Sequence, residues 1–302
     1  MPSRRLLVKC YAKVNLDLRV LGKRDDGYHE LRTVFQTVAL HDTLEVRLES
    51  GPGGVDLECD AAELGGPSNL AARAAEAMRQ ELGLRGRINL RLTKRIPWGA
   101  GLGGGSSDAA AALRAVAQLA GKPVPPERLL AVAAALGADV PFFLLGGTAV
   151  GLGRGAEVFP LPDLPRRHVL LVFPGFPVNT AKAYAELDAR SAALTEGPQT
   201  DRIYSFCASL WGRRVCRPEN DFETVVFSIY PQVARLKRLL TEAGASPALL
   251  SGSGSAVYGL FDSRQQATRA GKSVMARYPA WRVWVSRTVS RKESEKQWKP
   301  IA

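Results

Sequence analysis

A glycine-rich segment carries the clearest chemical signal in this sequence. The stretch IPWGAGLGGGSSDAAAAL spans residues 96–113 and places five glycines before two serines, an aspartate and a run of alanines. Glycine lets the backbone approach an anion closely and point its N–H groups at it. The start of a helix adds unpaired N–H groups and the positive end of the helix dipole. The segment therefore predicts a phosphate-binding loop that leads into a helix.

Two common phosphate loops do not fit this segment. The P-loop pattern G-x-x-x-x-G-K-[ST] needs a lysine after its last glycine, whereas Ser106 follows Gly105. The dinucleotide pattern needs a parallel strand–helix–strand unit, which the surrounding sequence does not predict. The alternative is a flexible loop in which Asp108 only complements the helix dipole. We expect Asp108 in the first helical turn, with the hydroxyl groups of Ser106 and Ser107 as donors to phosphate.

Two isolated charged residues are further candidates for chemistry. Residues 8–20 alternate between apolar and polar, which predicts a half-buried strand with Lys13 and Asn15 on one face. Asp139 is the only charged residue between positions 129 and 153. A carboxylate in such an apolar run needs a partner when it is buried. Considered alone, Lys13 also fits an exposed strand lysine, and Asp139 fits a turn or helix-cap aspartate.

The apolar run around Asp139 is long enough for a membrane span. A carboxylate near the centre of such a span would cost about 2.5–3.5 kcal/mol. Pro141, Gly146 and Gly147 also interrupt the run. We therefore expect a buried core segment.

The elements that must position these residues alternate between strand and helix patterns, which indicates an α+β fold. A proline cluster at positions 160, 162 and 165 marks the expected boundary between two domains, residues 1–163 and 164–302. We expect the tail from residue 291 onward to be frayed. Strands are expected at 31–40, 42–49, 54–59, 87–97, 168–173 and 281–286, with a strand–glycine turn–strand unit over 247–261. Helices are expected at 68–83, 106–120, 126–137, 180–195, 221–230, 232–244 and 263–278.

Composition limits the classes of partner. The chain has 302 residues, 46% hydrophobic content and a formal net charge of +12, which favours anionic partners. Its basic residues are not interleaved with aromatic ones as single-strand binders often show. The four cysteines form no C-x-x-C pair and there are only three histidines, so a zinc site is not expected. The first ten residues lack the apolar stretch of a signal peptide, and we expect a cytoplasmic protein with free thiols.

Three segments together resemble the motifs of the GHMP kinases, in the expected order. AKVNLDLRVLGKRDDGYHEL at 12–31 is similar to the first motif, the glycine-rich segment to the central ATP motif, and SGSGSAVYGLF at 251–261 to the third. Lys13, Asn15 and the RDDGYH turn further resemble the branch whose acceptor is a cytidine-diphosphate-linked methylerythritol, in the non-mevalonate isoprenoid precursor pathway. GADVPFF at 137–143 and NDFE at 220–223 agree with that branch.

The resemblance implies a fold and a reaction. The first domain would be like domain 2 of ribosomal protein S5, and the second, with its basic tail, would be ferredoxin-like. ATP would donate its γ-phosphate to the 2-hydroxyl of the acceptor, with Mg²⁺. The alternatives are a homoserine or mevalonate type of GHMP kinase, or an RNA-binding protein. We expect small-molecule partners only, no nucleic acid or membrane partner, and a monomer or homodimer.

The resemblance also implies roles for individual residues. Lys13 and Asp139 would be the catalytic pair. Possible Mg²⁺ ligands are Ser106, Ser107 and Asp108. The residues that would bind ATP are Asn69, Leu70, Lys94, Pro97, Gly99, Ala100, Gly101, Leu102, Gly103, Gly104, Gly105, Ser106 and Ser107. The residues that would bind the acceptor are Asn15, Tyr28, His29, Asp139, Thr180, Tyr184, Gly252 and Ser253, with Tyr28 and Tyr184 on opposite faces of the cytosine.

Overall fold

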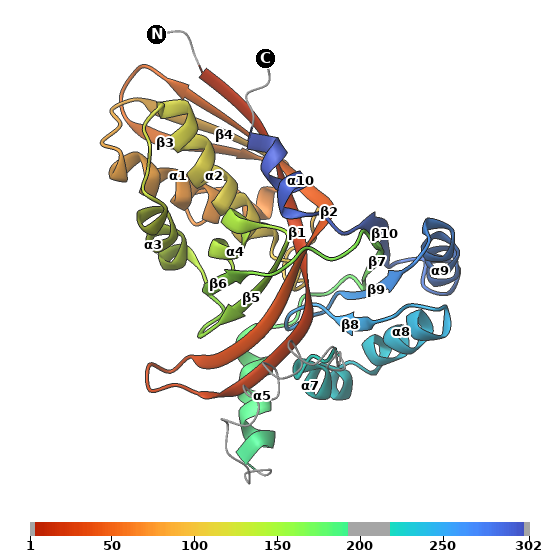
Figure 1. The fold of residues 1–302 in the computed structure, drawn as a ribbon. Helices are drawn as coiled ribbons and strands as arrows, with labels where there is room; N and C mark the ends of the chain where they lie inside the picture. The colour runs from red at the N-terminus through yellow and green to blue at the C-terminus, as the bar shows by residue number, and fades with distance from the viewer. Residues whose placement is uncertain (1–3, 193–217, 299–302) are drawn as a thin grey trace.

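The computed structural model describes residues 4–192 and 218–298 and contains two sheets (Figure 1). The first sheet has the strand order β3-β4-β2-β5-β6, and β1 pairs with β2 beside this path. All of its pairings are antiparallel except β3 with β4. Its strands are β1 (Arg4–Lys23), β2 (His29–Glu49), β3 (Gly54–Cys59), β4 (Arg87–Thr93), β5 (Thr148–Leu152) and β6 (Glu157–Pro160).

The long β1–β2 hairpin differs from the sequence prediction in two ways. The strands expected at 31–40 and 42–49 are one strand, which bends where the pairing shifts register between Tyr11 and Ala12. Burial alternates along β1 only up to Tyr11, and residues 12–15 are all buried. The cause is that both faces are covered: Ala12 and Val14 pack against the second sheet, while Gly103 and Gly252 lie against Lys13 and Asn15 on the other face. The expectation of a half-buried strand is therefore wrong for the part that carries Lys13.

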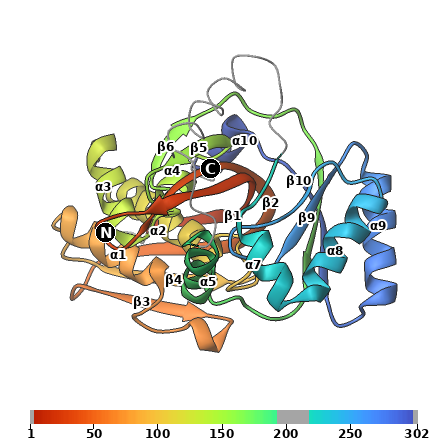
Figure 2. The same ribbon diagram turned by 90° about the horizontal axis from the view of Figure 1, so that it is seen from below.

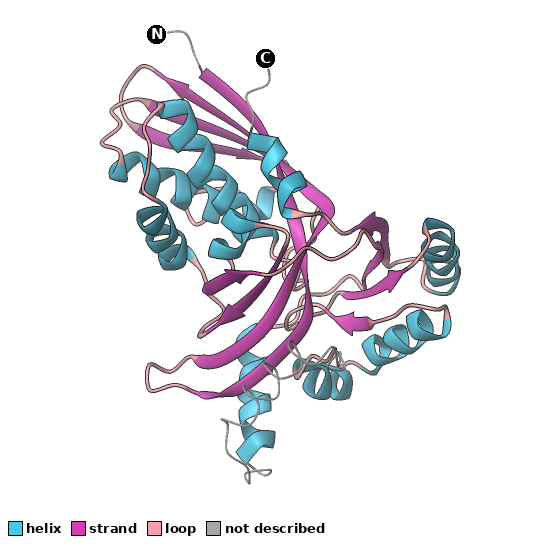
Figure 3. Cartoon of the chain, viewed as in Figure 1, coloured by secondary structure: helices cyan, strands magenta, loops and turns pink. Residues whose placement is uncertain are grey.

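The helices of the first unit lie together on one face of the first sheet (Figure 3). Asn69 caps α1 by accepting the N–H of Ala71 at 2.8 Å. Among the described residues no helix is long and apolar enough to cross a membrane. Residues 129–153 contain most of α3, then α4 and β5. The helices are α1 (Leu70–Glu81), α2 (Gly104–Ala120), α3 (Pro126–Leu136) and α4 (Val140–Leu145), with a 3-10 turn η1 (Ala62–Leu64) before α1.

The second sheet is fully antiparallel, with the order β10-β7-β9-β8. This order, with helices between β7 and β8 and between β9 and β10, is the βαββαβ arrangement of ferredoxin-like folds. Figure 2 shows α8 and α9 side by side over this sheet. The strands are β7 (His168–Phe173), β8 (Ala248–Leu250), β9 (Val257–Phe261) and β10 (Arg282–Arg287). The helices are α5 (Thr180–Ala192), α7 (Phe222–Ile229), α8 (Pro231–Glu242) and α9 (Arg264–Arg277).

The C-terminal segment is ordered as far as it is described, so the expectation of a frayed tail is wrong for residues 291–298. It forms α10 (Arg291–Glu295) and a 3-10 turn η2 (Lys296–Trp298). The Arg291 guanidinium donates to Thr148 O at 2.8 Å, and Trp298 packs on the first core with the Arg114 guanidinium 4.4 Å from its ring centre. The predicted domain boundary at 163/164 lies between β6 and β7. This boundary stays a prediction, because residues 291–298, which belong to the predicted second domain, pack on the first sheet and its core.

Three charged side chains form a buried cluster beneath the glycine-rich segment. The Lys94 ammonium lies 2.7 Å from Asp108 Oδ2 and also bonds Asp42. Asp42 further accepts the backbone N–H groups of Arg95 and Ile96. Burial opposes the charge on Lys94, but the two carboxylates raise its pKa above the usual value. One ammonium cannot neutralise two carboxylates. Burial and the field of Asp42 therefore raise the pKa of Asp108 to about 7, although Lys94 opposes the shift.

The raised pKa of Asp108 predicts a pH-dependent stability. The unfolded carboxyl titrates near 3.8, so between about pH 4 and pH 7 the folded state holds a proton that the unfolded state has released. The free energy of unfolding should fall as pH rises through this window. Asp108→Asn removes the titration and should flatten this fall. Urea unfolding at several pH values measures the effect, with the exposed Asp262→Asn as control; curves of equal slope for wild type and Asp108→Asn would contradict it.

The docked tail predicts a second stability effect. Trp298→Ala should lower the free energy of unfolding by about 2 kcal/mol, because a large aromatic side chain loses its packing on the first core. Leu130→Ala, at an exposed position on α3, should change it by less than about 0.5 kcal/mol. Denaturant unfolding compares the two. If Trp298→Ala were as stable as Leu130→Ala, the tail would contribute nothing to the fold.

Candidate active site

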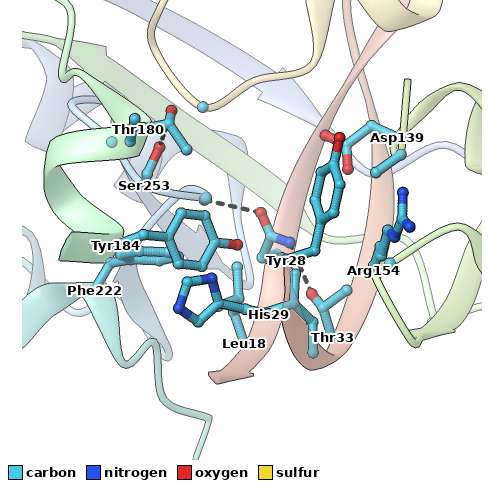
Figure 4. A pocket seen from close by; sticks show the side chains of 18 of the residues that line it. Leu18, Tyr28, His29, Thr33, Asp139, Arg154, Thr180, Tyr184, Phe222 and Ser253 are labelled. Atoms are coloured by element: carbon cyan, nitrogen blue, oxygen red, sulfur yellow. Dashed lines mark hydrogen bonds between the residues drawn. The ribbon is translucent and has the colours of Figure 1, made fainter. Parts of the chain in front are cut away.

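A cavity of about 740 Å³ opens where the β1–β2 hairpin, the glycine-rich segment and α5 meet (Figure 4). The turn before α4 and the β8–β9 loop also contribute to its wall. Both predicted catalytic residues and every residue predicted to bind the acceptor line it: Lys13, Asn15, Tyr28, His29, Asp139, Thr180, Tyr184, Gly252 and Ser253. Residues more than 200 positions apart in the sequence are thus brought together at one site.

Lys13 and Asp139 form an ion pair across this cavity. Lys13 Nζ lies 3.5 Å from Asp139 Oδ2. The Lys13 side chain is only 4% exposed, whereas that of Asp139 is 33% exposed. Asp139 directly precedes α4 but its side chain makes no cap hydrogen bond. The alternative of an exposed strand lysine is therefore wrong for Lys13. Asp139 does lie in a turn at the start of α4, but its side chain pairs with Lys13 and does not cap the helix. The pair presents a carboxylate to the cavity with a buried cation behind it.

Asn15 connects Lys13 to the third motif. Its Oδ1 accepts from Lys13 Nζ and from the backbone N–H of Gly252, both at 2.8 Å. Its Nδ2 donates to Thr33 Oγ1 at 2.7 Å. This confirms that Lys13 and Asn15 share a face of the strand. Asn15 thus holds both the Lys13 ammonium and the backbone of Gly252 in place. Its contact with the acceptor stays a prediction.

The glycine-rich segment is held against the third motif at close range. Gly101 has φ +78°, and a Cβ there would lie 1.9 Å from Ser251 O. Ser251 Oγ donates to Gly101 O at 2.9 Å, and the N–H of Ala256 donates to Ala100 O at 3.1 Å. Gly103, with φ +70°, immediately precedes α2. Any other residue at position 101 would push the two loops apart. The close contact therefore requires a glycine there.

Only part of the predicted ATP set lies at this cavity. Gly99, Gly101 and Gly103 line it. Asn69 and Leu70 begin α1, and Leu70 lies beside Gly105, so the starts of α1 and α2 are neighbours. The predicted residues outside the cavity lining are Asn69, Leu70, Lys94, Pro97, Ala100, Leu102, Gly104, Gly105, Ser106 and Ser107. Their contacts with ATP stay predictions.

Two expectations about charge near the loop need correction. Asp108 is not in the first turn of α2, which begins at Gly104. It is buried and bonded to Lys94, so its carboxylate is not free to hold a metal beside the loop. The Lys94 ammonium is itself paired with Asp42 and Asp108. The cluster thus supports the loop from beneath.

The aromatic end of the cavity is arranged differently from the expected pair of rings around a base. The His29 ring stacks on Tyr184, with centroids 4.3 Å apart, and His29 Nε2 lies 2.7 Å from Asp188 Oδ1. Tyr28 is exposed, and the Arg154 guanidinium lies 3.8 Å from its ring centre. Burial, with the field of Asp139, raises the pKa of Tyr184, so its hydroxyl stays neutral. In this structure one face of Tyr184 is therefore covered by His29.

Sequence reasoning missed several residues of the cavity wall. Arg154 comes from the β5–β6 turn and also bonds Asp26 at 2.8 Å, which links that turn to the hairpin. Asp188 lies on α5, one turn after Tyr184, a spacing that places both on one helix face. Phe222 meets Tyr184 edge-on, with centroids 4.8 Å apart. The spacing of Asp188 is the only one of these signals visible in the sequence.

The described residues contain no group of three or more His, Cys, Asp or Glu side chains placed to hold a metal ion. Mg²⁺ usually binds phosphate oxygens together with one or two carboxylates, so a full protein cage is not required. Asp139 presents a partly exposed carboxylate to the cavity, and Ser106 lies half-buried in the first turn of α2. Of the residues predicted to hold Mg²⁺, Asp108 does not fit this role because it is buried and bonded to Lys94, and Ser106 stays a prediction.

Comparison with known proteins agrees with this geometry. The profile of the GHMP kinases N terminal domain matches residues 69–147, and that of the GHMP kinases C terminal domain matches residues 204–280. The chain is 51% identical over 270 residues to 4-diphosphocytidyl-2-C-methyl-D-erythritol kinase of Solibacter usitatus, covering 89% of this chain and 85% of that one. It is 39% identical over 289 residues to the kinase of the same name from Geobacter sulfurreducens, covering 95% and 100%.

Solved structures show the same likeness. A crystal structure of 4-(cytidine 5'-diphospho)-2C-methyl-D-erythritol kinase matches with a TM-score of 0.76 and 36% identity, covering 94% of this chain and 99% of that chain. Homoserine kinase from Cytophaga hutchinsonii matches with a TM-score of 0.71 at 22% identity, which is a likeness of fold alone. The α+β GHMP kinase fold implied by the resemblance is thereby confirmed, and the chain belongs to the GHMP kinases, a family of small-molecule kinases.

Proposed function

We propose that this protein transfers the γ-phosphoryl group of ATP to the 2-hydroxyl of 4-diphosphocytidyl-2-C-methyl-D-erythritol. The observation that carries the proposal is the Lys13–Asp139 pair in a cavity that also holds Tyr28, His29 and Tyr184. Lys13 and Asp139 suit the transfer of a phosphoryl group to an alcohol. The aromatic residues suit the binding of a nucleotide base. The relatives that bear this kinase name, at up to 51% identity, support it.

Phosphoryl transfer depends mainly on positioning and on neutralising charge. In this proposal Asp139 orients the acceptor hydroxyl and takes its proton. Lys13 pairs with the Asp139 carboxylate and stabilises the charge that develops on the transferred group. The backbone of residues 101–107 and the start of α2 hold the phosphates of ATP. Mg²⁺ bound to the phosphates, with Ser106 as a ligand from the start of α2, would supply further charge neutralisation.

The alternatives differ in what they require of the cavity. A homoserine or mevalonate kinase needs no binding site for a base, so the aromatic end with Arg154 and Asp188 favours a nucleotide-linked acceptor. RNA binding would use the positive charge but gives no role to Lys13 opposite Asp139. The proposal includes a cytoplasmic location, small-molecule partners only, and a monomer or homodimer. A coupled assay of ADP release with Mg²⁺–ATP and each acceptor in turn tests it; turnover with homoserine or mevalonate alone would overturn it.

The role of Asp139 predicts a loss of rate at constant binding. Asp139→Asn keeps the size of the side chain but removes the proton acceptor, so kcat should fall by a factor of about 10²–10⁴. The KM for ATP should change by less than about threefold, because the phosphate loop is untouched. Asp262→Asn, which alters an exposed aspartate, is the matched control and should be fully active. A kcat within tenfold of wild type would show that Asp139 does not act on the hydroxyl.

The role of Tyr184 predicts a change in acceptor affinity. Tyr184→Leu should raise the KM for the cytidine acceptor by about 10- to 100-fold, since a base loses its stacking partner. Tyr184→Phe keeps the ring and should stay within about threefold of wild type. Steady-state kinetics with each substrate varied in turn provides the measurement. Equal KM values for the Leu and Phe variants would mean that the ring does not contact the acceptor.

A further inference from the structure

A second cavity, of about 360 Å³, lies at the joint between the two sheets and shares no lining residue with the active-site cavity. Its walls come from the middle of β2, the residue before Ile96, and the starts of β7 and α9, together with β10. In Figure 1, β10 and α9 lie to the right of the β1–β2 ribbon, whereas β5 and β6 lie to its left. The lining residues that matter here are His41, Arg95, Arg166, Arg264, Trp284 and Arg287.

The charges around this second cavity are unbalanced. Four arginines and two histidines line it, and no carboxylate does. The guanidinium of Arg287 is paired with the Glu293 carboxylate, which lies nearby. In the described part of the chain, the side chains of Arg95, Arg166 and Arg264 have no hydrogen bond or ion pair. The hydrogen bond from Arg287 lowers the pKa of Glu293, and the field of Arg166 adds to this shift. Three guanidinium groups are therefore left without a carboxylate of their own.

Such an arrangement favours an anion. Like charges around one hollow repel one another, and a concave surface concentrates their positive potential. Guanidinium groups bind the oxygens of carboxylates and phosphates through paired N–H donors, and three of them match the higher charge and the larger number of oxygens of a phosphate. Arg264 is also the first residue of α9, a helix of 14 residues, so the positive end of that helix dipole faces the same region.

The rest of the lining is apolar, and this narrows the class of ligand. Leu40, Val285 and the half-buried Trp284 lie beside the arginines. The Arg282 guanidinium already occupies a position 4.9 Å from the Trp284 ring centre. We propose that this second cavity binds a small organic phosphate or diphosphate, with the phosphate on Arg95, Arg166 and Arg264 and the organic part against Leu40 and Trp284. This binding does not depend on which acceptor the kinase uses.

Two tryptophans allow the second cavity and the active site to be observed separately. Trp284 lines the second cavity, and Trp98 lies in the glycine-rich segment. Their indole N–H resonances can be assigned with Trp284→Phe and Trp98→Phe. Titration of the full chain with pyrophosphate at constant ionic strength should shift the Trp284 signal to saturation, with its own midpoint. No shift of Trp284 at millimolar pyrophosphate would overturn the proposal.

A matched pair of variants tests the arginines. Arg166→Gln with Arg264→Gln removes two charges from the second cavity, and Arg235→Gln with Arg238→Gln removes two exposed arginines from α8. The first pair should weaken the pyrophosphate midpoint at Trp284 at least tenfold and leave kinase activity unchanged. The second pair should change neither. If both pairs of substitutions weakened pyrophosphate binding equally, the effect would come from net charge alone, and the proposal of a specific site would be overturned.

The organic part of the ligand needs its own comparison. Phenyl phosphate should bind more tightly than inorganic phosphate, and Trp284→Ala, read out by calorimetry, should abolish this difference. Equal affinity of the two probes in the wild type would restrict the ligand to a free phosphate or diphosphate and overturn the organic part of the proposal. An RNA oligonucleotide could instead bind more tightly than phenyl phosphate and inorganic phosphate. If the double variant Arg166→Gln with Arg264→Gln lost this binding, the second cavity would be part of a nucleic-acid surface and the proposal would be overturned.

Discussion

The ammonium group of Lys13 is the charge around which the site is organised. It lies almost fully buried at the joint between the two sheets, where an unpaired cation would be very costly. Two partners stabilise it: Asn15 from the same strand and Asp139 from the turn before α4. Asn15 is held in turn by Thr33 and by the backbone of Gly252. A single buried cation thus connects the first strand, the apolar run and the third glycine motif.

The same joint explains why the glycine motifs must be glycine. The glycine-rich segment and the β8–β9 loop approach each other so closely that a Cβ at Gly101 would collide with Ser251 O. Asn220, in the NDFE stretch, fixes the other side of that loop by donating to Leu250 O and Gly252 O. Beneath the segment, the Asp42–Lys94–Asp108 cluster connects α2 to β2 and β4. The glycine-rich segment is therefore held from two sides, by the β8–β9 loop and by this cluster, which fixes the direction of its N–H groups.

Local sequence signals located most elements because those signals are short-range. The cap at Asn69, the glycine after Ala120 and the alternation along β4 each act within a few residues, and the helices and strands were found close to their predicted limits. Errors arose where distant segments interact. The two expected strands form the single strand β2 because both pair with β1, a partner that lies outside either segment. Trp298 packs on a core whose residues come from much earlier in the chain.

By itself, the sequence determined which residue types are present for phosphoryl transfer: a glycine-rich segment before a helix, a lysine beside an asparagine, and a lone carboxylate in an apolar run. Only the tertiary structure decided their relations. It buried Lys13 and placed it 3.5 Å from Asp139, bonded Asp108 to Lys94 instead of leaving it beside the loop, and set His29 against Tyr184. The physical reason is that periodicity and capping depend on neighbours in the chain, whereas ion pairs, burial and ring stacking depend on which distant segments the two sheets bring together.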